Sequence, residues 1–258
     1  MKNIFLYDVH THTNMSPMIN ELDNIVAICK DRNIIWNAVG TNVEDSTITV
    51  EQAHKYKGQI YATVGIHPDN CKDINDIQKL EDLYLNNKDV VVAWGEIGLD
   101  YHYENYDKEK QILFFKKQLE IVNKYNLPVC IHVRQAEEDC FEILKMVKNP
   151  SKVWIHCFAM GPDWAKKYVD AGYMISIPGI VTFKNAKALH EAIKVIPLDK
   201  MMVETDGPWL SPEPYRGKTN YPHYVQFVME NIANRLEMPK EELSKKLTAN
   251  AVNFFGIK

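Results

Sequence analysis

The apolar residues of this chain gather in eight short runs that are separated by longer segments with helical spacing. Each run is nearly continuous and rich in β-branched residues, as is typical of a strand that is buried on both faces of a parallel sheet. The segments between the runs are long enough to cross from one parallel strand to the next. The runs cover residues 4–12, 33–41, 59–68, 90–100, 127–134, 152–158, 172–179 and 200–208.

Eight strand and helix units in 258 residues predict an α/β fold that closes into a (β/α)8 barrel of the TIM type, rather than an open sheet. Residues 107–126 and 136–149 show the helical pattern clearly. Helices within 231–237 and 240–255 are expected to cover the last strand and the barrel wall. Because no linker or shift in composition interrupts the pattern, we expect residues 1–258 to form a single domain.

Composition and charge narrow the functional classes. The 46% hydrophobic and 25% charged fractions are those of an ordinary globular protein. A formal net charge of -4 argues against a broad basic surface, so any contact with nucleic acid must be local or made through bound metal. The five cysteines form no CxxC pair, which disfavours a disulfide framework and a cysteine zinc site. The polar, short N-terminal apolar run predicts neither a signal peptide nor a membrane span, and we expect a cytoplasmic protein.

Polar residues that bind metals follow the apolar runs. In the first run, alternation places Asp8, His10 and His12 on one face of the strand and Tyr7 on the other. Two histidines at this spacing leave metal binding and a core or rim position equally open.

Similar polar residues end four other runs, with Glu96 expected on the same strand face as Trp94. The carboxyl ends of barrel strands meet at one face, where barrel enzymes assemble their active sites. Four imidazoles and two carboxylates exceed the ligands of one tetrahedral site, which favours two divalent ions bridged by a carboxylate. The six candidate ligands are His10, His12, Glu96, His132, His156 and Asp206.

The order and spacing of seven motifs resemble the TatD family of metal-dependent hydrolases. The motifs are DVHTH, VGIHP, GEIGLDY, PVCIHVRQA, WIHCFAMG, ETDGPWLSPEPYRGKTNYP and LTANAVNFF, and they span nearly the whole chain. The resemblance implies a barrel of the amidohydrolase kind, dependence on divalent metal, and deoxyribonuclease activity of the 3′-to-5′ exonuclease type. It also implies that His10, His12 and Asp206 surround one metal, that His132 and His156 surround the other, and that Glu96 lies between them.

Further residues receive roles from their chemistry. Asp206 is the candidate general base, with a role as ligand only as the alternative. Glu204 is expected to accept a hydrogen bond from a ligand histidine, or else to form a buried salt bridge. Four residues are candidates for holding phosphate, with simple surface solvation as the alternative for the last two: His67, Arg134, Arg216 and Lys218. Candidates for stacking on nucleobases, or for packing loops together, are Tyr101, Tyr103, Phe158, Trp209 and Tyr215. No metal role is assigned to His54, His102, His190 or His223.

The sequence therefore predicts a phosphodiesterase or deoxyribonuclease that acts on a nucleic-acid strand end or a small phosphodiester, with zinc, magnesium or manganese as the ions. No obligatory protein partner and no membrane are expected. The same metal core serves carbonyl substrates, so a hydrolase of amides or esters such as a D-aminoacyl-tRNA deacylase stays open. A non-catalytic barrel with structural metal is disfavoured, because structural zinc sites are typically closed and cysteine-rich.

Overall fold

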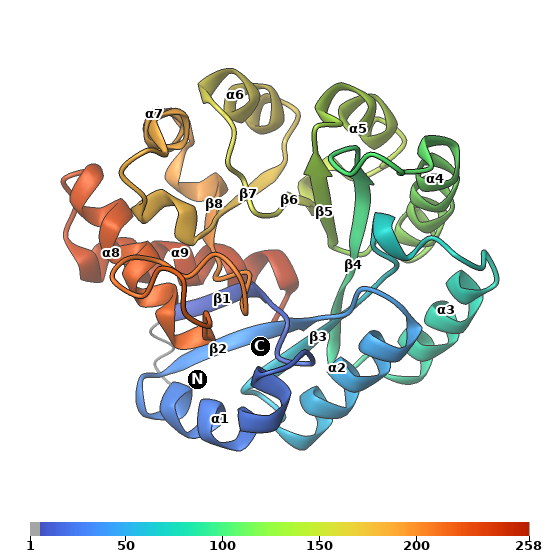
Figure 1. The fold of residues 1–258 in the computed structure, drawn as a ribbon, viewed down its shortest axis with the longest axis horizontal. Helices are drawn as coiled ribbons and strands as arrows, with labels where there is room; N and C mark the ends of the chain where they lie inside the picture. Colours follow the sequence, from blue (N-terminus) through green and yellow to red (C-terminus); the bar gives the residue numbers. More distant parts are fainter. Residues whose placement is uncertain (1–5, 258) are drawn as a thin grey trace.

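A ring of eight parallel strands forms the centre of the molecule, and helices surround it (Figure 1). The computed structural model describes residues 6–257, so residues 4 and 5 of the first expected strand lie outside the described part. The strands follow one another around the ring in sequence order. They are β1 (Leu6–Thr11), β2 (Ile34–Val39), β3 (Ile60–Val64), β4 (Val91–Asp100), β5 (Val129–Arg134), β6 (Val153–Ile155), β7 (Met174–Ile177) and β8 (Met201–Val203).

The eight predicted strands and the barrel are thus confirmed. Hydrogen bonds beyond the end of β8 tie it to β1: the Asp206 amide donates to the His10 carbonyl at 2.9 Å, and the His12 amide donates to the Gly207 carbonyl at 2.7 Å. These bonds bring the first and last strands of the chain side by side. They also place the residues that follow β8 next to the His-x-His pair of β1.

The helices pack against the outside of the ring (Figure 1). Side-chain caps begin two of them, where Asn42 and Asp107 accept backbone amides at the starts of α2 and α4. The helices are α1 (Leu22–Asp31), α2 (Val43–Lys55), α3 (Asp76–Asn86), α4 (Lys108–Tyr125), α5 (Glu137–Leu144), α6 (Pro162–Asp170), α7 (Lys187–Val195), α8 (Val225–Arg235) and α9 (Lys240–Phe255). No helix within residues 6–257 is long and apolar enough to cross a membrane.

Two helix predictions differ from the structure in their bounds. The helix predicted over 136–149 is shorter in the structure, where α5 ends at Leu144 and the chain runs through turns to Pro150. The pattern over 231–237 lies in a helix that begins earlier, at Val225. The helices predicted over 107–126 and 240–255 agree with α4 and α9.

Side chains fill the interior of the barrel below the strand ends, as in other closed barrels. Phe255 from α9 enters this interior, with its ring 5.5 Å from the Tyr7 ring and 5.6 Å from the Trp154 ring. α9 therefore covers the amino-terminal end of the barrel and leaves the carboxyl-terminal end free for a site. The inner cluster consists of Tyr7, Val9, Ile35, Ala93, Cys130, Trp154, Met174, Met202, Ala251, Phe254 and Phe255.

Strict alternation along β1 and β4 is wrong, because each strand contains a bulge next to its candidate ligands. Four residues of β4, from Trp94 to Ile97, lie opposite three residues of β5, and a similar shift lies between Asp8 and Thr11 of β1. A bulge changes which face the following side chains point to. Trp94 therefore packs outward and donates to Gln118 of α4, whereas Glu96 faces the barrel interior.

Candidate metal centre

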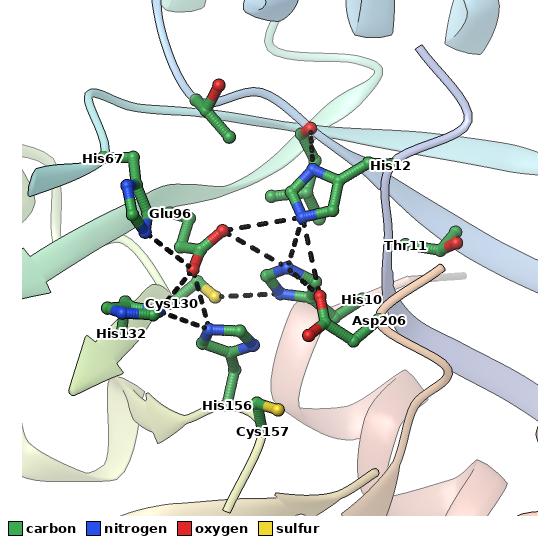
Figure 2. Close-up of polar contacts among 12 residues, drawn as sticks. His10, Thr11, His12, His67, Glu96, Cys130, His132, His156, Cys157 and Asp206 are labelled. Atoms are coloured by element: carbon green, nitrogen blue, oxygen red, sulfur yellow. Dashed lines mark hydrogen bonds and ion pairs between the residues drawn. The ribbon is translucent and has the colours of Figure 1, made fainter. Parts of the chain in front are cut away.

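Six candidate ligands from five strand ends converge at the carboxyl-terminal end of the barrel (Figure 2). Glu96 reaches the centre because its neighbour Gly95 has no side chain. A Cβ on Gly95 would lie 2.6 Å from the Cβ of Cys130, and its φ of 138° is one that other residues rarely adopt. The close packing of β4 against β5 thus depends on glycine at this position, and it delivers the Glu96 carboxylate between the imidazoles.

One group of ligand atoms surrounds the Oε2 atom of Glu96. The Nε2 atoms of His10 and His12 lie 3.2 Å apart, and they lie 3.4 and 3.6 Å from Glu96 Oε2. Asp206 Oδ1 lies 3.6 Å from both nitrogens. Four ligands at roughly 2.0–2.2 Å from a tetrahedral ion would be separated by about 3.3–3.6 Å. The measured separations therefore fit a divalent ion held by these four atoms.

A second group surrounds the other oxygen of the same carboxylate. Glu96 Oε1 lies 2.7 Å from His156 Nε2 and 2.9 Å from His132 Nδ1, and the two nitrogens are 3.3 Å apart. Glu96 Oε2 thus faces the His10 and His12 rings, whereas Oε1 faces the His132 and His156 rings and, at 3.6 Å, the His67 ring (Figure 2). The 2.7 and 2.9 Å separations are those of direct hydrogen bonds, shorter than the about 3.3–3.6 Å between ligands of one ion, so the two imidazoles here contact Glu96 directly.

The electrostatic balance of the cluster also favours cations. Burial raises the pKa of Glu96, but the surrounding imidazoles, His156 foremost, outweigh burial and hold that pKa well below its usual range. Burial likewise opposes charge on His156, and the Glu96 and Glu204 carboxylates raise its pKa well above the usual value. The cluster is therefore a buried place where ionised carboxylates attract positive charge.

Each of the four imidazoles also contacts a group on its far side from Glu96. His12 Nδ1 lies 3.0 Å from the Val39 carbonyl, and His132 Nε2 lies 3.0 Å from Asp100 Oδ2. His10 Nδ1 lies 3.3 Å from the sulfur of Cys130, and burial raises the pKa of that thiol. Such contacts orient an imidazole and select its tautomer.

Asp100 is a site residue that the sequence predictions missed, although it follows Glu96 by four residues on the same strand. Its carboxylate is buried and also accepts the amide of His102 at 2.9 Å. The signal that could have identified it is an acidic residue at the strand end beside β5, where the register pairs Asp100 with Arg134, two residues from His132.

Glu204 lies behind His156, as expected, but its shortest contacts are to other groups. Its Oε1 accepts the Cys157 amide at 2.6 Å, and its Oε2 accepts the Ser176 hydroxyl at 2.5 Å. His156 Nδ1 is 3.5 Å from Glu204 Oε1, an ion-pair distance, and has no hydrogen-bond partner within residues 6–257. Glu204 has no Lys or Arg ion-pair partner in that range. Glu204 thus lies at an ion-pair distance from His156 and lacks the hydrogen bond expected from a ligand histidine, while both roles predicted for Glu204 stay predictions.

His67 lies in the cluster itself rather than at its outer edge. Its Nε2 is 3.6 Å from Glu96 Oε1, and its ring meets the His132 ring edge-on at 4.5 Å. The His67 Nδ1 accepts the Asp69 amide at 3.2 Å, so the proton of the neutral ring lies on Nε2. Burial lowers the pKa of His67 to about 3, which keeps the ring neutral.

A cavity of about 650 Å³ opens over the cluster. Asp206 lines it with a side chain that is 13% exposed, whereas Glu96 is 4% exposed and lies beneath it. Asp206 has a φ of 56°, in the left-handed region where non-glycine residues are uncommon and tend to mark functional sites. His67 and Arg134 also line the cavity.

The aromatic candidates divide by position. Trp209 and Tyr103 line the cavity and are 51% and 56% exposed, and the Arg134 guanidinium lies 5.5 Å from the Tyr103 ring. Phe158 is fully buried in the core, and Tyr215 stacks on Tyr224 at 4.3 Å. Tyr101 is half-buried and donates to Asp139 at 2.9 Å. Packing thus accounts for Phe158, Tyr215 and Tyr101.

Arg216 and Lys218 are not among the residues that line the cavity. The Arg216 guanidinium lies over the Phe183 ring at 4.2 Å. This placement does not support the phosphate contact expected for the two residues.

The four histidines without an assigned metal role lie outside the ligand groups described above. His54 is exposed on α2 and contacts Asn87 at 2.8 Å, and His190 on α7 contacts the Val181 carbonyl at 2.9 Å. His102 is exposed after β4, and His223 is buried beside Tyr221.

The sequence model of the family described as TatD related DNase matches residues 7–256. This chain belongs to the TatD related DNase family. It is 39% identical to a protein named uncharacterized metal-dependent hydrolase in Mycoplasma genitalium, over 96% of this chain and 98% of that one. Proteins with the same kind of name are 37% identical in Bacillus subtilis and 33% identical in Escherichia coli K12, each over 98% of this chain and at least 97% of its own length. The family places the chain among the metal-dependent hydrolases.

Solved structures show the same fold for the TatD-family chain. A TatD homolog from Escherichia coli superposes with a TM-score of 0.93 at 24% identity, covering 99% of both chains. A TatD-family hydrolase from Entamoeba histolytica has a TM-score of 0.88 at 20% identity, covering 96% and 97%. A lactonase from Listeria monocytogenes, at 16% identity, has a TM-score of 0.66 and covers 100% and 96%. These likenesses concern the fold alone.

Proposed function

We propose that this TatD-family chain is a phosphodiesterase of the 3′-to-5′ deoxyribonuclease type that binds two divalent ions. The observation that carries the proposal is the position of Glu96 between two groups of candidate ligands, with His10 and His12 beside one oxygen and His132 and His156 beside the other at 2.7–3.6 Å. His10, His12 and Asp206 would hold one ion and His132 and His156 the other, with Glu96 shared. Two ions bound there would supply Lewis acidity that activates a water and neutralises charge on phosphoryl oxygens.

Asp206 is the residue that we assign as general base. Its Oδ1 faces the His10 and His12 nitrogens, and its carboxylate borders the cavity from which substrate and water approach. Burial opposes ionisation, but the imidazoles, with His12 the strongest, lower the pKa of Asp206. A carboxylate that is ionised and within reach of the cavity can accept a proton from water.

Arg134 and His67 are the residues that we assign to phosphate oxygens. Arg134 forms no ion pair within residues 6–257, so its guanidinium is free to contact an anion bidentately. His67 presents a protonated Nε2, which can donate a hydrogen bond without carrying charge. Trp209 and Tyr103 offer exposed rings to a neighbouring base.

The cavity suits a strand end or a small phosphodiester better than a long duplex. Arg134 is its only Lys or Arg among the described lining residues, so few phosphates would be neutralised there. Asp69 and Glu137 line the same cavity and would repel further phosphates. These two carboxylates favour a second candidate, an aminoacyl ester or amide whose free amino group they would attract, as in a D-aminoacyl-tRNA deacylase.

A substrate panel tests the proposal. Protein freed of metal and then loaded with zinc, manganese or magnesium is offered a single-stranded oligonucleotide, an aryl phosphodiester, an aryl ester and a D-aminoacyl-tRNA. We expect metal-dependent cleavage of the oligonucleotide from its 3′ end and of the aryl phosphodiester. Cleavage restricted to the ester and the aminoacyl-tRNA would replace the phosphodiesterase proposal with the second candidate.

A further inference from the structure

On the side away from Glu96, the imidazoles of the four candidate ligand histidines face different kinds of atom. His12 and His132 face oxygens, the Val39 carbonyl and the Asp100 carboxylate, whereas His156 Nδ1 has no hydrogen-bond partner within residues 6–257 and lies 3.5 Å from a Glu204 oxygen. The fourth, His10, meets the sulfur of Cys130 at 3.3 Å (Figure 2). A histidine that binds a metal almost always donates its other N–H to a carboxylate, a carbonyl or water, so a sulfur partner departs from the usual pattern.

Packing confines the His10 ring, and within residues 6–257 it supplies no other polar partner for the ring's Nδ1. The His156 ring stacks on it at 4.0 Å, and the Trp154 ring meets it edge-on at 5.7 Å. His10 and Cys130 are both fully buried, so bulk solvent does not reach either group. Within residues 6–257, Cys130 is the hydrogen-bond partner recorded for this nitrogen.

We propose that the sulfur of Cys130 accepts the Nδ1–H of His10 and so fixes the tautomer in which His10 Nε2 is free to bind an ion, an inference that rests on the proposed two-metal function. A neutral imidazole carries one proton, so a lone pair on Nε2 requires the proton on Nδ1. The Nε2 atom is the one that faces Glu96 Oε2 and Asp206 Oδ1. Cys130 is therefore a positioning residue.

The same geometry argues against Cys130 as a metal ligand at the first site. His10, Cys130 and His156 lie close enough together to hold an ion in principle. The sulfur, however, is next to Nδ1, whereas Glu96 and Asp206 are next to Nε2 on the other side of the ring. An ion bound by Nε2 and the two carboxylates would not also bind this sulfur.

Two substitutions at Cys130 and one matched control test the inference. Cys130→Ala removes the acceptor, and Cys130→Ser restores one with a hydroxyl oxygen. Cys140→Ala is the control, because Cys140 is also fully buried but lies on α5, outside the cluster. Zinc binding is measured by competition with a chelator, and the His10 tautomer is measured by long-range ¹H–¹⁵N NMR of the zinc-loaded protein.

We expect Cys130→Ala to lower the affinity for one of the two ions by about 10- to 100-fold. The zinc affinity of Cys130→Ser should lie closer to that of the wild type, and that of Cys140→Ala should match it. The wild-type spectrum should show His10 protonated at Nδ1. Wild-type protein that binds two ions while Cys130→Ala matches the control overturns this inference alone.

Two other results also decide against the assignment. A thiolate-to-cobalt charge-transfer band in the cobalt-loaded wild type that Cys130→Ala lacks would make Cys130 a ligand. Wild-type protein that binds no divalent ion would overturn the proposed function together with this inference.

Discussion

Replacing Asp206 with asparagine separates its role as a base from its role as a ligand. The substitution Asp206→Asn is suitable because Asp206 has a φ of 56°, and asparagine tolerates the left-handed region. The amide oxygen that it introduces can still face His10 and His12, whose Nε2 atoms both lie 3.6 Å from Oδ1 of Asp206. The change therefore removes the basic carboxylate and keeps most of the ion's surroundings.

Loss of a general base typically lowers the rate by about 10² to 10⁴, equal to roughly 2.7–5.5 kcal/mol in the barrier. We expect a loss of this size in kcat of Asp206→Asn, measured on an aryl phosphodiester at saturating metal, with metal content determined in the same samples. Glu204→Gln is the control, since Glu204 lies behind His156 and does not line the cavity. Its loss should be about 10- to 100-fold and should follow metal affinity. Near-normal turnover of Asp206→Asn at full occupancy would refute its role as base and leave it at most a ligand.

Three further predictions follow from the contacts described. Glu96→Gln should lower the affinity for both ions, whereas His156→Ala should lower the affinity for one. Equal small losses in metal content in both variants would remove the bridging assignment. Asp100→Asn should lower metal affinity about 10- to 100-fold, because Asp100 contacts the far side of the His132 ring. Asp139→Asn, a partly exposed carboxylate on α5, is the control and should leave the affinity unchanged. Equal affinities of the two variants would contradict the role of Asp100. Burial lowers the pKa of His223 to about 4, below the unfolded value of about 6.5, so its contribution to stability is complete above pH 6.5 and is lost as the pH falls towards 4. Urea unfolding should therefore show that the free energy of unfolding of the wild type approaches that of His223→Phe by about 1–3 kcal/mol as the pH falls from 6.5 to 4. Parallel pH profiles of the two proteins would rule out the assignment.

The strand ends and their candidate ligands were predictable because a closed parallel barrel leaves a simple pattern. A buried apolar run followed by histidine or a carboxylate identifies a strand end, and the barrel brings all such ends to one face. Four candidate ligands could be predicted in this way without knowing which way each side chain points: His10, His132, His156 and Asp206. Their convergence within a few ångströms followed from the fold itself.

The details that were not predictable depend on local register and on loops. The bulges in β1 and β4 reverse the expected faces, so Trp94 points outward although alternation placed it beside Glu96. Asp100 and Cys130 contact side chains on other strands, and a sequence pattern does not show which side chains of two strands meet. Arg216 follows β8 in a long loop, and the side of the cavity that such a loop covers is not encoded in any periodic pattern.

The most direct test of the central claim measures how turnover of an aryl phosphodiester depends on the number of divalent ions bound per chain. Protein is stripped with a chelator, dialysed and titrated with zinc or manganese, and bound metal and turnover are measured in the same samples. We predict no hydrolysis in the metal-free protein, two ions per chain at saturation, and turnover that rises with occupancy. Undiminished hydrolysis by protein without metal would contradict the account, as would saturation of activity at one ion with no second ion bound.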